Sequence, residues 1–323
     1  MDDRLLELLR MALSQHATDI HFVVRGSSVT LQLRCGQKIR QLDSDARDMA
    51  LFRYLQYLAD LELSDRSRPQ TGRFEMDVDG KRLALRFALM HSLLVTSGVL
   101  RILNGRLDWT LKDCCSQKVQ TEPLKKALRQ KSGLILLSGP TGSGKTTTLY
   151  AMLNELKGAS IFTLEDPIEI HSEAYVQIQI NEKQHLGYDE GISQLLRHDP
   201  DVIMIGEIRD SVAAAMALRC ALTGHLVLSS IHAASAVNAI ERMCELGVSR
   251  TVLMEMLVCV SCQRLITLKN QKGKMCVYEV LQPSHLERVR QGQPPGEGFV
   301  SLAERMERLA EKNLISQYQQ NSW

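Results

Sequence analysis

The sequence predicts two domains, a smaller α+β domain followed by a larger α/β domain with a mostly parallel sheet. At 323 residues the chain is long enough for about two domains of ordinary size. The first hundred residues mix short β-like runs with helical stretches, whereas from about Pro123 helices alternate with continuous apolar strands. Strands of that kind are typical of a parallel sheet that is buried on both faces.

The smaller domain is expected over residues 1–104. Its helical signals are apolar residues that recur every three or four positions, and its strand signals are β-like runs bounded by turn residues. The Asp79-Gly80 pair between two alternating segments is a strong hairpin signal. The predicted elements are a helix over 4–13, β-like runs over 18–26 and 27–42, a helix over 46–63, and β-like runs over 72–92 and 98–103.

The next segment, residues 105–122, is irregular and polar, and we interpret it as a linker. The second domain is then expected over residues 123–323, with a polar, helical C-terminal portion. A helix over 145–158 follows its first strand. The predicted strands cover 133–139, 159–166, 200–207 and 225–232.

Composition argues against a nucleic-acid partner. The net charge is only +2, and no run of five or six like charges appears. Aromatic residues make up 5% of the chain, which leaves few side chains on which bases could stack. We therefore expect no direct contact with nucleic acid.

Several features indicate a cytosolic protein. The longest apolar stretches are far shorter than the roughly 20 residues of a membrane span, and the charged N-terminus lacks the apolar centre of a signal peptide. The eight cysteines are scattered through apolar segments, which favours free thiols kept reduced in the cytosol.

The stretch "GPTGSGKTTTLY" carries the pattern G-x-x-x-x-G-K-[ST] between a predicted strand and a predicted helix. Its glycines let backbone N–H groups surround a phosphate, and the helix N-terminus adds partial positive charge. Lys145 is expected to reach the β- and γ-oxygens, and the Thr146 hydroxyl to coordinate Mg²⁺. The expected nucleotide-binding residues are Gly139, Pro140, Thr141, Gly142, Ser143, Gly144, Lys145, Thr146 and Thr147.

The other half of a nucleotide site is expected at the strand in "PDVIMIGEIRD", which ends in a carboxylate. Glu207 is expected at the C-terminal tip of that strand, where α/β sheets bind ligands. A strand of this kind, called Walker B in proteins with such a phosphate loop, more commonly ends in aspartate. The longer glutamate is suited to hold Mg²⁺ through a water.

Acidic and imidazole side chains follow two other predicted strands. Glu165, Asp166 and Glu169 lie within "FTLEDPIEI", where a carboxylate near a γ-phosphate suits water activation or metal positioning. A solvated acidic loop is the alternative. His225 and His232 bracket "LVLSSI", and they are either structural or sense the γ-phosphate.

These blocks, in this order, resemble the secretion ATPases of type II secretion, type IV pili and competence systems. The phosphate loop matches the family's form nearly letter for letter. "LEDPIEI" resembles its Asp box, "GEIRD" its Walker B segment with Glu in place of Asp, and "TGHLVLSSIHA" its His box. "ATDIHF", "SCQRLI" and "CVYEVL" resemble further landmarks, so the resemblance runs over most of the chain.

The resemblance implies roles for individual residues. It makes Glu169 the carboxylate that polarises the attacking water, with Glu165 as the alternative. It places Glu207 on Mg²⁺ and gives His232 a role in inter-domain or γ-phosphate sensing.

The resemblance also implies a RecA-like ATPase domain behind a PAS-like α+β domain, with ATP and Mg²⁺ as cofactors. Family members form hexameric rings in which the N-terminal domain supplies arginines to the nucleotide. Similarity of "RFALMHS" and "GVLRIL" to the family makes Arg86 and Arg101 the candidates. The implied partners are a polytopic inner-membrane platform protein and, indirectly, pilin-like subunits, with the ring at the cytoplasmic face of the membrane.

Departures from the family pattern narrow the subtype. The one C-x-x-C, Cys259 to Cys262, precedes the "QRL" landmark, and we interpret its spacing as helix packing. Only Cys276 follows, so no zinc is expected. The chain also shows no counterpart of the extra N-terminal domain of large assembly ATPases and no retraction-type "AIRNLIRE" segment. It therefore looks most like competence members, which power assembly of a DNA-uptake pilus. Pilus retraction and type II secretion remain alternatives.

Three rival functions come from other classes. A RecA-like DNA-translocating motor would have a similar sheet, and a salt-dependent affinity for DNA would support it. A GTPase would need an N-K-x-D motif, which "NEKQ" at Asn181 does not supply. A scaffold that binds ATP without hydrolysing it would show no turnover.

Overall fold

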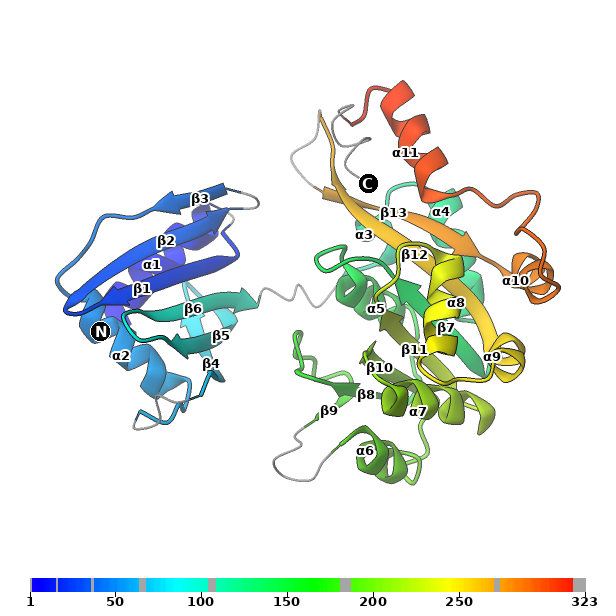
Figure 1. Ribbon diagram of the computed structural model, residues 1–323, viewed down its shortest axis with the longest axis horizontal. Helices are drawn as coiled ribbons and strands as arrows, with labels where there is room; N and C mark the ends of the chain where they lie inside the picture. The colour runs from blue at the N-terminus through cyan, green and yellow to red at the C-terminus, as the bar shows by residue number, and fades with distance from the viewer. Residues whose placement is uncertain are drawn as a thin grey trace. The chain divides into compact units, whose positions relative to one another are not determined.

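A computed structural model describes residues 2–15, 17–35, 38–63, 68–103, 109–180, 187–269 and 274–315. The chain forms two compact units, Met1–Gly105 and Arg106–Trp323 (Figure 1). Each unit has its own hydrophobic core. The two units are therefore described one at a time.

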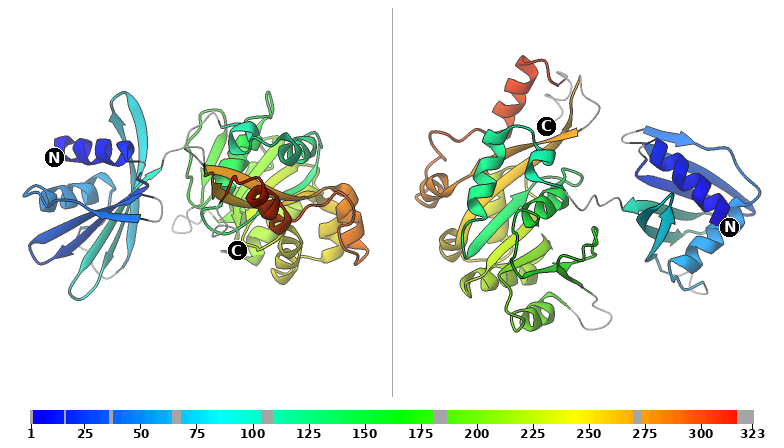
Figure 2. Two further views of the ribbon diagram at one scale, coloured as in Figure 1. Left: turned by 90° about the horizontal axis from the view of Figure 1, so that it is seen from above. Right: turned by 180° about the vertical axis from the view of Figure 1, so that it is seen from behind.

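The first unit is a six-stranded antiparallel sheet in the order β3-β2-β1-β6-β5-β4. Two helices lie on one face of this sheet (Figure 2). The elements are α1 (Asp2–Ser14), β1 (Asp19–Arg25), β2 (Ser28–Cys35), β3 (Lys38–Gln41), α2 (Asp48–Leu58), β4 (Gln70–Val78), β5 (Lys81–His91) and β6 (Thr96–Leu103). The predicted order of helices and strands is thus confirmed, except that the run 27–42 forms two strands.

Apolar and polar side chains alternate along the strands, and the apolar ones form the core beneath the two helices. Phe22 of β1, Phe52 of α2 and Phe87 of β5 form a cluster with ring centroids 5.8–6.0 Å apart. The predicted hairpin is confirmed, since Asp79 and Gly80 have φ values of 53° and 76° between β4 and β5. Positive φ at both central residues is what a two-residue hairpin turn of type I′ requires.

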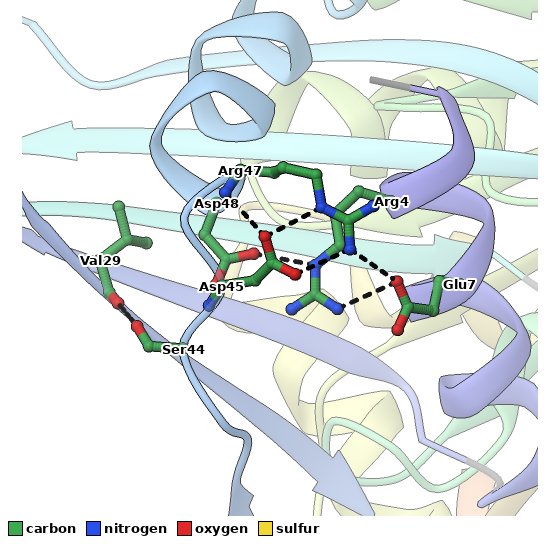
Figure 3. A network of polar contacts seen from close by, with 7 residues as sticks. All are labelled: Arg4, Glu7, Val29, Ser44, Asp45, Arg47 and Asp48. Carbon is green, nitrogen blue, oxygen red and sulfur yellow. Dashed lines mark hydrogen bonds and ion pairs between the residues drawn. The ribbon is translucent and has the colours of Figure 1, made fainter.

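A buried ion pair joins the two helices (Figure 3). Nε of Arg4 in α1 donates to Oδ1 of Asp48 in α2 at 3.0 Å, and both side chains are almost fully buried. The other Asp48 oxygen accepts the backbone N–H of Asp45 at 2.7 Å. Breaking such a pair leaves an uncompensated buried charge, so it holds α1 and α2 together.

The sheet face away from the helices carries a row of charged residues. In register across five strands stand Arg34 of β2, Asp19 of β1, Arg101 of β6, Arg86 of β5 and Arg73 of β4. Because residues directly opposite each other point to the same face, this row places four arginines and one carboxylate on one surface.

The second unit is built on a seven-stranded sheet in the order β13-β12-β7-β11-β10-β8-β9. All neighbours pair in parallel except β12 and β13. The strands are β7 (Gly133–Ser138), β8 (Ile161–Glu165), β9 (Val176–Gln179), β10 (Val202–Ile208), β11 (Leu226–Ile231), β12 (Leu257–Thr267) and β13 (Lys274–Leu281). The predicted α/β class with a mostly parallel sheet is confirmed.

Helices cover both faces of this sheet. Helix α8 lies in front of it in Figure 1, and α4 lies in front of it in the reverse view of Figure 2. The helices are α3 (Leu111–Cys114), α4 (Lys118–Ala127), α5 (Lys145–Leu153), α6 (Tyr188–Leu195), α7 (Ser211–Leu222), α8 (Ala236–Glu245), α9 (Arg250–Met256), α10 (Pro283–Arg290) and α11 (Leu302–Glu311). Within the described part of the chain, none of these or the earlier helices is both long and apolar enough for a bilayer crossing.

Two expectations differ from the structure. The segment expected as a linker, 105–122, contains α3 and the start of α4, and Leu111 and Cys114 belong to the core of the second unit. The segment around Cys259 and Cys262 is strand β12, not a helix. Both thiols are buried, but a spacing of three along a strand directs them to opposite faces of the sheet.

Glu279 of β13 connects the two helices α8 and α11. Its Oε1 accepts the backbone N–H of Ala236 at 2.7 Å, and its Oε2 accepts that of Leu302 at 2.9 Å. These are the first residues of α8 and α11, where helices have unsatisfied N–H groups and favour negative charge. The buried carboxylate therefore caps both helices at once.

Candidate functional site

The phosphate loop joins the carboxyl end of β7 to the N-terminus of α5. Gly139 has a φ of 143°, and a side-chain Cβ there would lie 2.5 Å from the carbonyl oxygen of Gln263. Gly144 has a φ of 88° at the N-cap of α5. Both positions therefore require glycine, and the loop lies against a helix N-terminus, which binds anions.

Lys145 begins α5, and its side chain turns back over the loop. Its Nζ donates to the carbonyl oxygens of Gly139 at 2.9 Å and Pro140 at 3.3 Å. Burial lowers the pKa of Lys145, while the charges of Glu207 and Glu169 oppose that shift. Phosphate oxygens offer this ammonium stronger, charged acceptors than the two carbonyls do.

The other predicted phosphate-site residues lie around this lysine. Pro140, Thr141 and Gly142 are exposed at the tip of the loop, and Thr146 and Thr147 are half-buried in the first turn of α5. Ser143 is buried, and its Oγ has no hydrogen-bond partner among the described residues. A ligand in the loop would find this unused hydroxyl.

Strand β12 supports the loop from the neighbouring position in the sheet. Nε2 of Gln263 donates to the carbonyl oxygen of Ser143 at 2.8 Å, and the Gln263 side chain is fully buried. The Cys276 thiol of β13 also lies under the loop, 3.8 Å from the same oxygen. The sequence marked "SCQRLI" only as a landmark, and the structure gives its glutamine a physical role.

Glu165, at the end of β8, is committed to internal hydrogen bonds. Its Oε1 accepts from Tyr150 and Thr163 at 2.7 Å each and from Gln177 at 3.2 Å. Burial raises the pKa of Glu165, against these three hydrogen bonds, which lower it. The roles of Tyr150 and Gln177 were not predicted, because Tyr150 ends the stretch "GPTGSGKTTTLY" outside the phosphate-binding pattern and Gln177 lies outside every quoted block.

Glu169 lies in the loop that follows β8 and is exposed. Nε2 of Gln177 donates to the carbonyl oxygen of the next residue, Ile170, at 2.8 Å, which ties this loop to β9. The charge of Glu169 also acts on Lys145. Of the two candidate carboxylates, Glu169 is the one whose oxygens face solvent.

Glu207 of β10 lies among charged residues at the carboxyl ends of the strands. Its Oε2 accepts from Nε of Arg209 at 2.9 Å, and its Oε1 lies 2.5 Å from Nε2 of His232. Arg209 also approaches Asp166, at 3.9 Å. The structure thus brings together the Walker B carboxylate, the His-box imidazole and one carboxylate of the Asp box.

Arg209 is a site cation that sequence reasoning missed. Arg209 stands inside "GEIRD" with an exposed side chain, and no role was predicted for it. The motif itself carried this signal. His225, by contrast, was predicted as a possible site residue but lies away from the site. It lies at the amino end of β11, where its Nδ1 is 3.1 Å from Oγ1 of Thr223, so it is not part of the site.

Arg86 and Arg101, the two candidates from the first domain, are directly opposite each other on β5 and β6. Nε of Arg101 donates to Oδ1 of the buried Asp19 at 2.6 Å. Asp19 belongs to the "ATDIHF" landmark, and its pairing with Arg101 was not predicted. Arg86 and Arg101 therefore share one face of the first unit's sheet.

The residues present fit Mg²⁺ and a nucleoside triphosphate. The loop offers glycine positions, a helix N-terminus and Lys145 to the phosphates. Thr146 and Glu207 would hold Mg²⁺, which takes only a few protein oxygens. A bound Mg²⁺ would supply positive charge against the charge that develops on the phosphates.

Comparisons with known proteins identify the family of the chain. The sequence profile of the family described as "Type II/IV secretion system protein" matches residues 3–314. Over 269 residues the chain is 39% identical to "Competence protein ComGA" of Halalkalibacterium halodurans, covering 81% of this chain and 77% of that protein. Over 266 residues it is 36% identical to "Type II secretion system protein E" of Pseudomonas aeruginosa, covering 80% of this chain but only 53% of that protein.

The fold is also similar to a solved structure, that of the Legionella pneumophila ATPase DotB. The two superpose with a TM-score of 0.78 at 20% sequence identity, covering 97% of this chain and 92% of that one. The profile match and the relatives show that the chain belongs to the type II/IV secretion system protein family.

Proposed function

We propose that this protein is an ATPase that hydrolyses ATP to ADP and phosphate with Mg²⁺ and couples hydrolysis to mechanical work. One observation carries the proposal. The phosphate loop with Lys145 and the carboxylates of Glu169 and Glu207 meet at the carboxyl edge of one parallel sheet. Family membership supports the same activity.

Phosphate binding follows from the geometry of the loop. Lys145 exchanges its two carbonyl acceptors for phosphate oxygens, while the glycine-rich backbone and the start of α5 hold the other phosphate charges. Thr146 and Glu207 hold the metal, the latter directly or through a water. Arg209 fixes the position of the Glu207 carboxylate through its hydrogen bond to Oε2, and His232 lies beside Oε1.

Water activation is assigned to Glu169. Its carboxylate is exposed and close enough to Lys145 to affect it, so it can accept a proton from water beside the γ-phosphate. Glu165 instead holds the loop in place through Tyr150 and Gln177. Arg86 and Arg101 supply positive charge to the γ-phosphate when the first domain approaches the site.

For the biological role, we propose assembly of a competence pseudopilus for DNA uptake. The chain would act as a hexamer at the cytoplasmic face of the membrane, on a polytopic platform protein, and reach pilin-like subunits indirectly. Similarity to a competence protein over four fifths of the chain supports this choice. The type II secretion relative supports the alternative that the motor drives protein secretion.

ATP turnover of the purified full chain tests the enzymatic proposal. Lys145→Ala should abolish turnover by removing the phosphate ligand, with loss of nucleotide binding measured in parallel by calorimetry. Lys131→Ala is the matched control, because Lys131 is an exposed lysine before β7 in the same unit. A wild-type chain that binds ATP without releasing phosphate would instead be a scaffold.

The biological role is tested separately. Deleting the gene and restoring it with wild-type or Lys145→Ala copies should show DNA uptake that depends on an intact phosphate loop. Secretion of exported proteins, measured in the same strains, is expected to stay normal. Loss of secretion with normal DNA uptake would favour the type II secretion alternative.

A further inference from the structure

The guanidinium of Arg101 is bound through Nε, whereas its two terminal nitrogens are unbound among the described residues. Its Nε donates to Oδ1 of Asp19 at 2.6 Å. The Asp19 side chain is only 3% exposed, whereas that of Arg101 is 48% exposed. The structure gives the two terminal nitrogens of Arg101 no hydrogen bond to any described residue. They are therefore available for bidentate contact with an anion.

The carboxylate that holds Arg101 is itself fixed. Oδ2 of Asp19 accepts from Oγ1 of Thr18 at 2.7 Å. The backbone of Thr18 bonds to both neighbouring strands, through Ile102 N at 3.0 Å and the carbonyl oxygen of Arg34 at 2.9 Å. Both oxygens of Asp19 are thus occupied, and the acceptor cannot turn away from Arg101.

Asp19 also compensates a crowded row of positive charge. Arg34 and Arg101 are its direct neighbours on either side, and Arg86 lies directly opposite Arg101 on the next strand. Like charges directly opposite each other on a sheet repel. A buried carboxylate between the arginines offsets this repulsion and lets Arg101 and Arg86 stand side by side.

We propose that Asp19 is a positioning residue for ATP hydrolysis. Its carboxylate binds Nε of Arg101, so that the two terminal nitrogens of Arg101 are presented to the γ-phosphate. The inference rests on the proposed role of Arg101 toward the nucleotide. It gives the aspartate of "ATDIHF" a function distinct from that of the carboxylates in the second domain.

The test compares Asp19→Asn, Arg101→Ala and the double variant in the full chain. Asp19→Asn keeps the shape of the side chain but removes its charge. We expect kcat to fall about 10- to 100-fold with little change in the KM for ATP, because the ground-state nucleotide is bound by the other domain. The double variant should be no slower than Arg101→Ala, since residues that act through one another are not additive.

Asp48→Asn is the matched control for folding. Asp48 is also a buried aspartate that accepts from an arginine Nε, but it lies between α1 and α2 on the helix-covered side (Figure 3). Its kcat per folded molecule should match wild type. An equal loss of kcat in Asp48→Asn would overturn the proposal, because the effect would then be general destabilisation.

The remaining outcomes separate this proposal from the proposed function. If Arg101→Ala lowers kcat while Asp19→Asn does not, Asp19 is not a positioning residue and the role of Arg101 stands. If Arg101→Ala turns over ATP normally, the role of Arg101 fails and this inference with it. Additive losses in the double variant would also overturn it. Should Asp19→Asn not fold, Thr18→Val removes only the second hydrogen bond and should give a smaller loss that also vanishes in the Arg101→Ala background.

Discussion

The amide of Gln263 in β12 donates to the carbonyl oxygen of Ser143, so a neighbouring strand fixes the phosphate loop from behind. Gln263→Leu keeps most of the volume but leaves that carbonyl with only the weak thiol donor of Cys276. Losing such a buried hydrogen bond costs about 1–3 kcal/mol. We therefore expect the Kd for ATP to rise about tenfold or more, measured by calorimetric titration. Gln291→Leu, on an exposed residue after α10, should bind as wild type does. Unchanged affinity in Gln263→Leu would show that the loop keeps its shape alone.

Glu169→Gln should bind ATP but lose turnover by about 10²–10⁴, the usual effect of removing one positioned catalytic group. Phosphate release and nucleotide affinity would be measured on the same preparation. Glu173→Gln, an exposed glutamate in the same loop, is the control and should be active. Normal turnover in Glu169→Gln would move the catalytic role to Glu165.

Acid should destabilise the first unit through His21. Its Nε2 is buried without a hydrogen-bond partner among the described residues. Burial lowers the pKa of His21 below the usual 6.5, with help from Arg34 and Arg101 and against the charge of Asp19. In acid the unfolded chain then binds a proton that the folded chain does not. The contribution of His21 to the free energy of unfolding is therefore fully present above pH 6.5. It is lost as the pH falls from 6.5 toward the lowered value.

His21→Gln should remove this dependence. The measurement is hydrogen exchange of peptides from β1 and β6 in the full chain at a series of pH values between 7 and 5, chosen about the reference pKa of His. Wild-type protection should decline with acid more steeply than that of the variant. Equal slopes would mean that His21 takes up its proton in the folded state.

Arg86→Ala and Arg101→Ala should each fold and bind ATP yet lose most hydrolysis and all DNA uptake. Lys145 is the only cation of the phosphate loop, and charge on the departing γ-phosphate needs more than one. The isolated second unit should likewise bind ATP without turning it over. Residues 106–323 are the right truncation, because a start at Pro123 would cut through α4. Full activity in that fragment would show that Arg209 suffices.

Strands buried on both faces were easy to predict, because runs such as Leu134–Leu137 have no polar interruption. The phosphate loop was equally clear, since its glycines have a backbone reason to be there. Strand β12 was harder. Cys259 and Cys262 are spaced like residues on one helix face, and only pairing with β7 and β13 makes the segment a strand.

Side-chain partnerships across the sheet were beyond sequence reasoning. Nothing local says that Asp19 meets Arg101, because the two residues are 82 positions apart and only the β1–β6 register joins them. The difference between Glu165 and Glu169 has the same origin. Both sit in one acidic block, but only Glu165 points inward to Tyr150 and Gln177.

Glu279 couples the positions of two helices in the second unit, α8 and α11. One carboxylate receives the first N–H of α8 through one oxygen and that of α11 through the other. Helix α8 starts four residues after His232, which contacts Glu207, while α11 lies more than sixty residues further along the chain. An N–H···O hydrogen bond needs a donor–acceptor distance of about 2.7–3.2 Å. The start of α8 therefore cannot shift unless α11 moves with it or one oxygen of the buried Glu279 carboxylate loses its hydrogen bond. This links the position of α11 to the edge of the sheet that carries the phosphate loop.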